Sequence, residues 1–413
     1  MKRIIVVGGG AAGMFAAGVA ASNGAKVTLF EPNDKLGKKL LITGKGRCNL
    51  TNDCDVSEVL SNIPNGSRFL YSAVNGFSPT ETMAFFENLG VRLKTERGGR
   101  VFPQSDKAVD VVNALKRYIN KHNVEIKYDR VVDLGVKNQE ITGVYATSGE
   151  HYADAVILAT GGKSYPLTGS TGDGYEMVKR VGHYVTELIG SLVPLNAESD
   201  VCSQMQGLAL KNVLMKVYDG GRKPIFEDFG ELLFTHFGIS GPITLSASAH
   251  MRDFEKKKYY VTVDLKPGLS EAKLDERILR DFEKFANRDF INALGELLPR
   301  LMIPVIVEKS GINPELKVHS ITRQQRRGLV ELLKSYRIDI ESKRPIEEAI
   351  ITSGGVDLRE INPKTMESKL IKGLYFAGEI IDADAYTGGF NLQIAWSTAY
   401  AAARAAGVHH PLP

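Results

Sequence analysis

Glycines at a fixed spacing near the N-terminus are the residues of this chain best suited to hold a phosphate. Gly8, Gly10 and Gly13 form a G-x-G-x-x-G pattern between the apolar run Ile4–Val7 and an Ala-rich segment that ends near Ser22. In a strand–turn–helix unit, the first glycine permits a tight turn, the second lets the backbone approach a pyrophosphate, and the third allows close helix packing. The N-terminus of the helix then faces the phosphate charge.

An acid follows at the position where such a unit holds a ribose. A second predicted strand, Lys26–Phe30, ends on Glu31, whose carboxylate can accept hydrogen bonds from adenosine ribose hydroxyls and disfavours a 2′-phosphate. Lys2 and Arg3 before an uncharged run are also typical of a secretion signal or a membrane anchor. The glycines inside that run and the strand after it favour the dinucleotide-binding unit.

The stretch 37–52, with the sequence GKKLLITGKGRCNLTN, is glycine-rich and basic. Such a loop can wrap backbone amides and cations around phosphates and ring edges, and we expect it to contact the ligand rather than to form a solvated surface loop. Cys48 in this stretch could be a nucleophile. Because nothing in the sequence shows what would lower its pKa, we expect it to be a small buried residue instead.

Two later strand-to-loop units carry small residues at the end of an apolar run. Residues 154–158 lead into Ala-Thr-Gly-Gly (159–162), and residues 373–376 lead into Ala377-Gly378-Glu379. Doubly wound sheets bind ligands at the carboxyl ends of their strands. A strand that ends in Ala-Gly-Glu is where flavoproteins hold the ribityl chain. The Gly388-Gly389 turn would aim a helix N-terminus at the pyrimidine edge of a flavin, where a positive dipole stabilises the negative charge of the reduced ring.

The region between these units has a different composition. Residues 192–264 predict short strands and turns, whereas residues 270–336 are mostly helical, with a capping box at Thr322–Gln325 and an apolar face that includes Tyr336. Nucleotide-fold features resume at Ile350. We therefore expect an insertion at 191–349, with a β part at 191–268 and a mainly helical part at 269–349. Residues 1–190 and 350–413 then form one dinucleotide-binding domain, in which alternating strands over 124–152 predict an antiparallel meander.

Composition excludes several classes of protein. The 413-residue chain is 43% apolar and 24% charged with a net charge of +4, which is ordinary for a globular protein and too small a charge to indicate nucleic acid or membrane by itself. Cys48, Cys54 and Cys202 form no C-x-x-C pair, so the sequence shows neither a dithiol redox motif nor a cysteine-rich zinc site. We expect a cytoplasmic protein without a metal.

The whole chain resembles the bacterial YhiN/BaiN-type family of FAD-dependent oxidoreductases, which are relatives of the glutathione-reductase-like flavoproteins. The resemblance rests on these motifs: GGGAAGM, TGKGRCNLTN, RVFPQSDKA, ATGGKSYPLTGSTGDGY, SLVPL, LLFTHFGISGP, ITSGGV and GLYFAGEIIDADAYTGGFNLQ. It implies an α/β fold with a Rossmann-like FAD-binding domain, an inserted β-barrel-like domain and a small helical subdomain. It also implies FAD held by the first and last segments. One branch of the family resembles reductases of conjugated double bonds in dehydro bile acids.

From the motifs and the resemblance we predict one set of FAD-binding residues. They are Gly8, Gly10, Ala11, Ala12, Gly13, Glu31, Lys38, Lys39, Thr43, Gly44, Gly46, Arg47, Cys48, Asn49, Val131, Thr160, Gly161, Gly162, Gly378, Glu379, Asp382, Gly388, Gly389, Asn391 and Leu392.

The segment Leu233–Pro242 is the strongest candidate for chemistry outside this set. It combines His236 with two hydroxyls and two glycines before a helix expected to start near Pro242. His236 could donate a proton or orient a substrate, and it could equally be a histidine that stabilises a turn. Arg100 and Ser105 are further candidates for contact with flavin or substrate.

We predict an FAD-dependent oxidoreductase that reduces an electron-poor, enone-type double bond of a small molecule through flavin N5, with hydride from NAD(P)H. No second G-x-G-x-x-G follows a strand, so NAD(P)H would be a transient co-substrate. Two alternatives stay open, an RNA-associated flavoprotein and a flavin redox sensor without turnover. The RNA alternative rests on seven basic residues within 320–344, which we interpret as a solvated helix face. We expect neither nucleic acid nor membrane as a partner.

Overall fold

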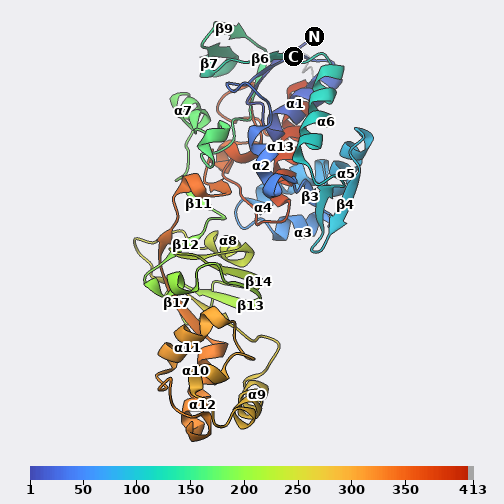
Figure 1. The fold of residues 1–413 in the computed structure, drawn as a ribbon. Coiled ribbons are helices and arrows are strands. Elements are labelled where there is room, and N and C mark those ends of the chain that lie inside the picture. The colour runs from blue at the N-terminus through green and yellow to red at the C-terminus, as the bar shows by residue number, and fades with distance from the viewer. Residues whose placement is uncertain (408–413) are drawn as a thin grey trace. The chain divides into compact units, whose positions relative to one another are not determined.

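The computed structural model describes residues 1–407, and they divide into two compact units (Figure 1). The first unit contains Met1–Ser191 and the chain from Ile346 onward, and the second contains Leu192–Pro345. Each unit has its own apolar core. The second unit is therefore an insertion in the sequence of the first.

A five-stranded parallel sheet forms the centre of the first unit. Its strand order is β19 (Leu374–Phe376), β10 (Ala155–Leu158), β1 (Arg3–Val7), β2 (Lys26–Phe30) and β6 (Glu125–Lys127). Alternate residues of β1 enter different cores, because Ile4 and Val6 belong to one cluster and Ile5 and Val7 to another. Burial of both faces explains why these strands are continuous apolar runs.

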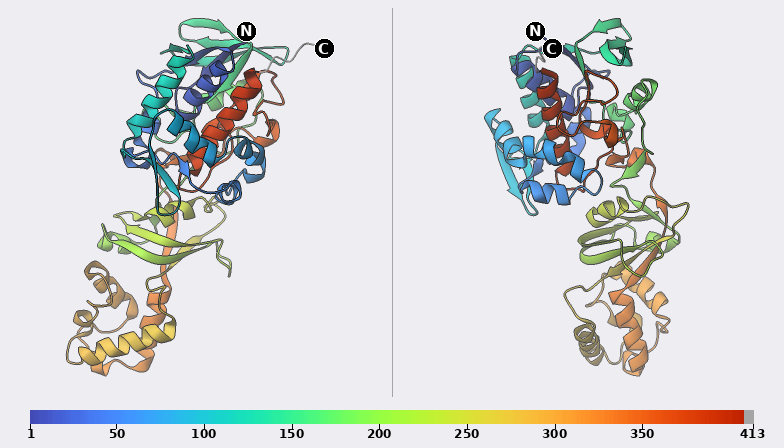
Figure 2. Two further views of the ribbon diagram at one scale, coloured as in Figure 1. Left: turned by 90° about the vertical axis from the view of Figure 1, so that its right-hand side faces the viewer. Right: turned by 180° about the vertical axis from the view of Figure 1, so that it is seen from behind.

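Three helices cover one face of this sheet. They are α1 (Ala11–Ser22), α6 (Ala108–Lys121) and α13 (Phe390–Gly407), which lie side by side in Figure 2 (left) in blue, teal and red. Four smaller helices follow β2 in the sequence: α2 (Lys38–Gly46), α3 (Val56–Ser61), α4 (Ser67–Gly76) and α5 (Pro79–Asn88). On the other face lie α7 (Asp173–Arg180) and a three-stranded antiparallel sheet, β7 (Val131–Lys137), β8 (Glu140–Ala146) and β9 (Gly149–Tyr152).

The predicted meander over 124–152 is therefore wrong in its first strand. Residues Glu125–Lys127 pair in parallel with β2, and only β7, β8 and β9 form an antiparallel sheet. The alternation of apolar residues does not show whether residues 125–127 pair with β7 or with β2, because either neighbour would bury the same side chains. Two further small sheets belong to this unit, β3 (Thr51–Asn52), β5 (Arg100–Pro103) and β4 (Leu93–Glu96) in one, and β11 (Ile189–Ser191) and β18 (Ile351–Ser353) in the other.

The second unit contains a closed six-stranded barrel. Its strand order is β12 (Leu195–Ala197), β15 (Gly238–Ser240), β14 (Phe226–Phe234), β13 (Ala209–Tyr218), β16 (Tyr259–Asp264) and β17 (Tyr336–Lys343). The short helix α8 (Pro242–Ser248) begins at Pro242, as predicted. Between β16 and β17 the chain forms four α-helices, α9 (Glu271–Lys284), α10 (Phe290–Ala293), α11 (Ile303–Ser310) and α12 (Arg323–Lys334), and two short 3₁₀ helices.

The prediction that Tyr336 continues a helix is wrong. The helix α12 does begin with the predicted capping box between Thr322 and Gln325, but it ends at Lys334. Tyr336, Ile338 and Ile340 are then buried on alternate positions of β17, with Arg337 exposed between them. This period of two is the signal of a strand, and β17 closes the barrel.

The architecture confirms the predicted fold class, a Rossmann-like α/β fold with an inserted barrel and a helical part. Within residues 1–407, no helix combines the length and the apolar character that crossing a bilayer requires.

Candidate cofactor-binding site

A long cavity runs across the carboxyl ends of β1, β2, β10 and β19 in the first unit. It encloses about 1380 Å³ of empty space, part of which is open to solvent. The carboxyl edge of a parallel sheet, beside the N-terminus of its first helix, is where doubly wound folds bind nucleotides. The residues of the β1–α1 turn form one wall of this cavity.

The backbone of the β1–α1 turn depends on its glycines. Gly8 has φ +104°, and its N–H donates to the carbonyl oxygen of Phe30 over 2.8 Å. A Cβ atom on Gly13 would overlap the carbonyl oxygen of Gly8, so only glycine allows α1 to start this close to the strand. Around Gly10, in contrast, a Cβ would meet no atom of the chain within 4 Å. No side chain caps α1, so its first N–H groups are available to a phosphate.

The carboxylate of Glu31 is held in position at the end of β2. One of its oxygens accepts the Gly9 N–H at 2.8 Å, and the other accepts the backbone N–H of Asn33 at 2.8 Å and its side-chain amide at 2.6 Å. The residue is only 6% exposed and lines the cavity. A carboxylate fixed by three donors can receive ribose hydroxyls without further rearrangement.

A polar network closes the cavity at the ends of β10 and β19. Lys39 Nζ lies 2.6 Å from Glu379 Oε2 and 2.8 Å from Ser164 Oγ. The second oxygen of Glu379 accepts the Ser164 hydroxyl at 3.0 Å and the Thr352 N–H at 2.8 Å. The network therefore joins α2, the loop after β10, β18 and the loop after β19. The Thr160 hydroxyl, which also lines the cavity, is buried and has no hydrogen-bond partner among residues 1–407.

The start of α13 forms the other end of the cavity. Gly388 and Gly389 have φ +130° and +102°, and a Cβ on Gly389 would overlap the backbone of Thr51. The Asn52 side-chain amide donates to the carbonyl oxygen of Gly388 at 3.1 Å. Asn391 in the first turn of α13 accepts the Ala385 N–H at 2.9 Å and donates back to its carbonyl oxygen at 2.7 Å. These contacts fix the turn from which α13 presents its N-terminus.

This geometry fits FAD. The open space at Gly10 and the uncapped helix suit a pyrophosphate, and the fixed carboxylate of Glu31 suits a ribose. The unpartnered hydroxyl of Thr160 lies where a bound ligand would supply a hydrogen bond.

Comparisons with known proteins agree with a nucleotide-binding site in this cavity. Residues 2–405 match the family model described as the HI0933-like protein Rossmann domain. The chain belongs to this family. It is similar to the "3-dehydro-bile acid delta(4,6)-reductase" of Clostridium scindens, with 34% identity over 98% of this chain and 99% of the relative. It is also similar to the "Ribosomal RNA dihydrouridine synthase" of Escherichia coli K12, with 29% identity over 97% of this chain and 96% of the relative.

Among solved structures, the 3-ketosteroid delta1-dehydrogenase of Sterolibacterium denitrificans is similar in fold. Its TM-score is 0.52, with 12% identity over 98% of this chain and 100% of that chain. The predicted membership of the YhiN/BaiN-type family is confirmed, and the protein is an FAD-dependent oxidoreductase.

Most of the predicted FAD-binding residues line the cavity, and their contact with FAD stays a prediction. They are Gly8, Gly10, Ala11, Ala12, Glu31, Lys38, Lys39, Thr43, Val131, Thr160, Gly161, Gly378, Glu379, Asn391 and Leu392.

The other predicted residues are not among those that line it. They are Gly13, Gly44, Gly46, Arg47, Cys48, Asn49, Gly162, Asp382, Gly388 and Gly389.

The stretch 37–52 differs from the expected loop. Lys38–Gly46 form the helix α2, kinked where Thr43, Gly44 and Lys45 leave helical geometry. Arg47 bonds to Glu96 and Asp106 and lies 4.1 Å from the centre of the Phe102 ring. Its hydrogen bond lowers the pKa of the Glu96 carboxyl below the usual value. Arg47 therefore supports the β3–β5–β4 sheet and does not line the cavity.

Cys48 is fully buried, and desolvation raises the pKa of its thiol to about 12. The structure therefore favours the buried residue over the nucleophile. Asp382 accepts the side-chain amide of Asn65 at 2.6 Å, which fixes the loop after β19.

Sequence reasoning missed several polar residues of the site. Asn33, Ser164 and Thr352 complete the hydrogen bonding of Glu31 and Glu379. Asn33 follows Glu31 by two residues, so local spacing could have indicated it. Thr352 lies in one of the quoted motifs, but its contact with the loop after β10 spans 189 positions in sequence, and no local pattern reports such a contact.

His236 belongs to the second unit, in the turn between β14 and β15. Its side chain is exposed, and its ring contacts that of Phe237 with centres 5.0 Å apart. The turn itself is closed by Thr235, whose N–H donates to the Gly238 carbonyl oxygen and whose hydroxyl accepts the Gly238 N–H. The histidine is therefore not needed to close the turn, and its role in the reaction stays a prediction.

Proposed function

We propose that this enzyme reduces a carbon–carbon double bond that is conjugated to a carbonyl group, with hydride from NAD(P)H. The observation that carries the proposal is the similarity, over 98% of the chain, to a relative named as a delta(4,6)-reductase of 3-dehydro bile acids. A ketone conjugated to ring double bonds is an electron-poor acceptor for hydride. The 5,6 double bond of uracil, which a dihydrouridine synthase reduces, is also conjugated to a carbonyl. The two names therefore share one type of reaction.

In this reaction FAD supplies a ring that accepts hydride from NAD(P)H and passes it to the double bond. The chain's own residues bind and orient. Glu31 and the uncapped N-terminus of α1 would hold the adenosine ribose and the pyrophosphate, and Lys39 with Glu379 would hold the ribityl chain. The N-terminus of α13 would stabilise negative charge at the pyrimidine edge of the ring.

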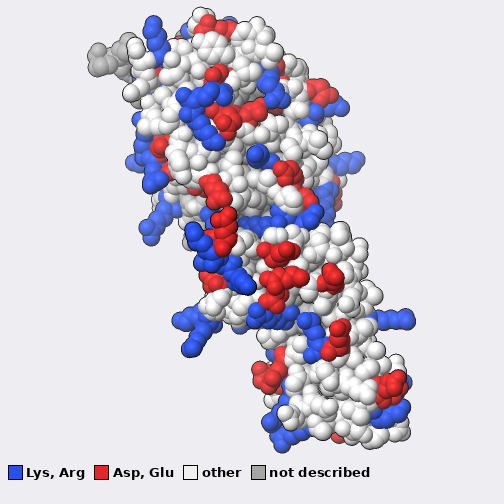
Figure 3. All heavy atoms as spheres, turned by 90° about the vertical axis from the view of Figure 1, so that its left-hand side faces the viewer, with Lys and Arg blue, Asp and Glu red and all other residues white. Residues whose placement is uncertain are grey.

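We propose a small molecule as the acceptor. On the face shown in Figure 3, Lys and Arg side chains are interspersed with Asp and Glu, in contrast to the single-sign surface typical of nucleic-acid binding. In the basic region 320–344, Arg326 pairs with Asp275, Lys334 with Asp264 and Arg337 with Asp339. Paired charges of this kind contribute little to phosphate binding. The free thiols Cys48, Cys54 and Cys202 support a reducing compartment, and we propose the cytoplasm.

A uracil base in ribosomal RNA is the second candidate acceptor. The similarity to the Escherichia coli relative favours it, since the match covers 97% of this chain. The same flavin chemistry would serve both acceptors, so only the acceptor itself distinguishes the two functions.

Anaerobic stopped-flow absorbance tests the proposal. FAD-loaded protein is mixed with NADH and, separately, with NADPH, and the reduced protein is then mixed with an unsaturated keto bile acid or with unmodified ribosomal RNA. We expect one of the nucleotides to bleach the oxidised-flavin band and the keto acid to restore it, with loss of the double bond in the product. Recovery of the band with the RNA alone would establish the second candidate. A flavin that neither nucleotide reduces would overturn the NAD(P)H half of the proposal.

A further inference from the structure

The tip of the β4–β5 hairpin lies against the turn that precedes α13. Three residues, Arg97, Gly98 and Gly99, connect the two strands, and both glycines have left-handed φ angles, +78° and +69°. The side-chain amide of Asn52 donates to the Gly98 carbonyl oxygen at 2.9 Å and to the Gly388 carbonyl oxygen at 3.1 Å. A Cβ on Gly99 would overlap the Asn52 side chain. One residue thus joins the hairpin tip to the turn that would face the flavin ring.

Basic side chains gather on the face of the sheet that Asn52 occupies. Asn52 pairs directly with Arg100, and Arg100 pairs directly with Glu96, so these three side chains project from the same face. Lys94 and Phe102 form the next pair on this face, and Arg47 stacks on the Phe102 ring. This face therefore carries three cations, Arg100, Lys94 and Arg47, and one carboxylate, Glu96.

The charges on this hairpin do not cancel. Glu96 and Asp106 are both bonded to Arg47 and Lys94. A third carboxylate, Asp53, accepts the Thr95 hydroxyl at 3.2 Å, and its N–H donates to the Gly99 carbonyl oxygen. Arg100 reaches Glu96 only at 4.0 Å, and its Nε donates to the backbone carbonyl oxygen of Arg97.

At the tip, Arg97 is exposed and forms no ion pair with any of residues 1–407. Its neighbour Arg100 has a side chain that is 47% exposed. Four cations, Arg47, Lys94, Arg97 and Arg100, thus face three carboxylates, Asp53, Glu96 and Asp106. The excess positive charge lies at the tip, on Arg97 and on the weakly paired Arg100, where an external anion can bind.

We propose that Arg97 and Arg100 bind an anionic group of the acceptor, a carboxylate or a phosphate, while its double bond lies at the flavin. The inference rests on the proposed function and names the substrate class, an unsaturated carbonyl compound that carries an anion. A guanidinium binds either oxyanion through two parallel N–H donors, and the anchor at Asn52 keeps the hairpin tip beside the turn before α13. The hairpin thereby selects acceptors by charge and at a distance from the reacting bond.

Binding experiments test this without turnover. Oxidised, FAD-loaded protein is titrated with an unsaturated keto bile acid and with its methyl ester, and separately with a uridine-rich oligoribonucleotide and with uridine. The change in the flavin absorbance spectrum gives each dissociation constant. We expect an anionic ligand to bind at least about tenfold more tightly than its neutral partner. Preference for the acid over the ester assigns the site to a carboxylate, and preference for the oligoribonucleotide over uridine assigns it to RNA phosphates.

The double variant Arg97→Ala/Arg100→Ala should lose this preference while binding of the neutral partner is unchanged. Arg92→Ala is the matched control, because Arg92 is an exposed arginine at the base of the same hairpin. It should keep the preference. Equal affinity for charged and neutral ligands in the wild type, or an unchanged preference in the double variant, overturns the inference. If acid and ester bind equally well and both are reduced, the inference fails and the proposed function stands. If the acid binds more tightly than the ester but neither is reduced, the proposed function fails and the charge preference stands.

Discussion

At the scale of single residues, the two glycines Gly13 and Gly10 of the β1–α1 turn have different roles, one in folding and one in ligand binding. Gly13→Ala would push a Cβ into the carbonyl oxygen of Gly8, so we expect a loss of about 1–3 kcal/mol in the free energy of unfolding. Gly10 has φ −79° and open space around it, so Gly10→Ala should leave the apoprotein as stable or up to about 1 kcal/mol more stable. Its methyl group would instead occupy the cavity where a pyrophosphate approaches.

Urea unfolding of the apoproteins and titration with FAD measure the two effects. We expect Gly10→Ala to weaken FAD binding at least about tenfold, which is the loss of about 1.4 kcal/mol of binding free energy. Normal FAD affinity in Gly10→Ala would show that the pyrophosphate does not approach this turn.

The three thiols provide a second prediction at this scale. Burial raises the pKa of Cys48 to about 12 and of Cys202 to about 11, and desolvation with nearby carboxylates raises that of Cys54 to about 12. Thiolates are the reactive form, and near pH 8 these groups are protonated. We expect no rapid reaction with a disulfide reagent in the native protein and three equivalents after denaturation. In Cys48→Ala, NAD(P)H should still reduce the flavin at an unchanged rate. A thiol that reacts rapidly in the native wild-type protein would contradict this prediction.

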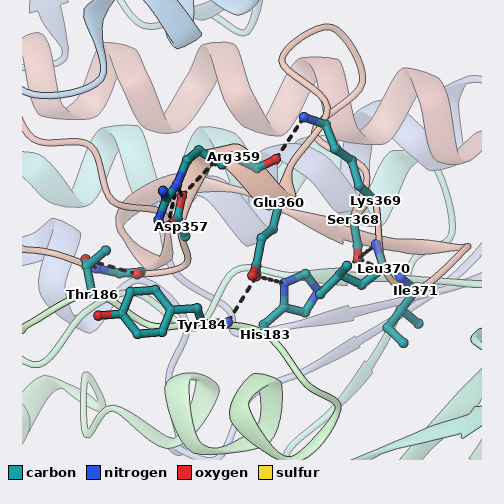
Figure 4. Close-up of polar contacts among 11 residues, drawn as sticks. His183, Tyr184, Thr186, Asp357, Arg359, Glu360, Ser368, Lys369, Leu370 and Ile371 are labelled. Atoms are coloured by element: carbon teal, nitrogen blue, oxygen red, sulfur yellow. Dashed lines mark hydrogen bonds and ion pairs between the residues drawn. The ribbon is translucent and has the colours of Figure 1, made fainter.

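At the scale of elements, a buried histidine connects α7 to the loop before β19 (Figure 4). His183 Nε2 lies 2.8 Å from the Ser368 hydroxyl, and Nδ1 lies 2.8 Å from Glu360 Oε2. Ser368 Oγ already accepts the N–H groups of Leu370 and Ile371, at 3.0 and 2.8 Å. Both of its lone pairs are used, so its hydrogen must point to Nε2. The histidine is therefore neutral, and its Nδ1–H donates to Glu360.

This arrangement makes the stability of the protein depend on pH. Desolvation lowers the pKa of His183 below 6.5, although Glu360 acts in the opposite direction. Above pH 6.5 the histidine is neutral in both states and the full stability is present. As the pH falls below 6.5, the unfolded chain binds a proton that the folded chain does not, so stability falls until the folded pKa is reached. Each unit of lowering corresponds to about 1.4 kcal/mol.

Urea unfolding between about pH 8 and about pH 5 measures this dependence. His183→Gln should be less stable at the higher pH by about 1–3 kcal/mol, because buried hydrogen bonds are lost, and should show a weaker decline with acid. His122→Gln is the control, since His122 is only partly buried and should keep the decline. An unchanged slope in His183→Gln would exclude this histidine as the source.

The elements that could be predicted from the sequence are those with a complete local signal. The run Ile4–Val7, the glycines after it and the acid at Glu31 appear within one short stretch, and Val7, Gly8, Gly10 and Glu31 line the cavity. The strand β17 also has a local signal, the burial of every second residue from Tyr336. The basic residues around it and the helix directly before it favoured a helical prediction instead. The pairing of β6 with β2 and the role of Thr352 depend on contacts far apart in sequence, which local periodicity does not report.

At the scale of the whole molecule, the chain leaves the first unit and returns to it at neighbouring points. Ser191 at the end of β11 pairs with Ile351 in β18. Asp384, which is fully buried, accepts the hydroxyls of Ser191 at 2.8 Å and of Ser353 at 2.9 Å. The two ends of the insertion are thus fixed by the first unit itself. Every residue that lines the cavity also belongs to this unit.

We therefore expect the first unit to fold and to bind FAD without the insertion. A variant in which a short Gly/Ser linker replaces Leu192–Pro345 should purify with about one FAD per chain. FAD titration of its apoprotein should give an affinity within about threefold of the full chain. The same variant with Gly10→Ala is the control and should lose the flavin. Failure to fold would mean that the second unit stabilises the first.

The reaction of this variant's reduced flavin with the acceptor then shows which unit supplies the proton. His236 lies within the removed segment, whereas Arg97 and Arg100 do not. If His236 supplies a proton, NAD(P)H should still reduce the flavin of the variant, and the variant should still prefer a charged acceptor. That acceptor should reoxidise the reduced flavin at least about tenfold more slowly than in the full chain. His236→Ala in the full chain should slow the same step to a similar extent. Normal reoxidation in both proteins would exclude His236 and place the proton donor in the first unit or in solvent.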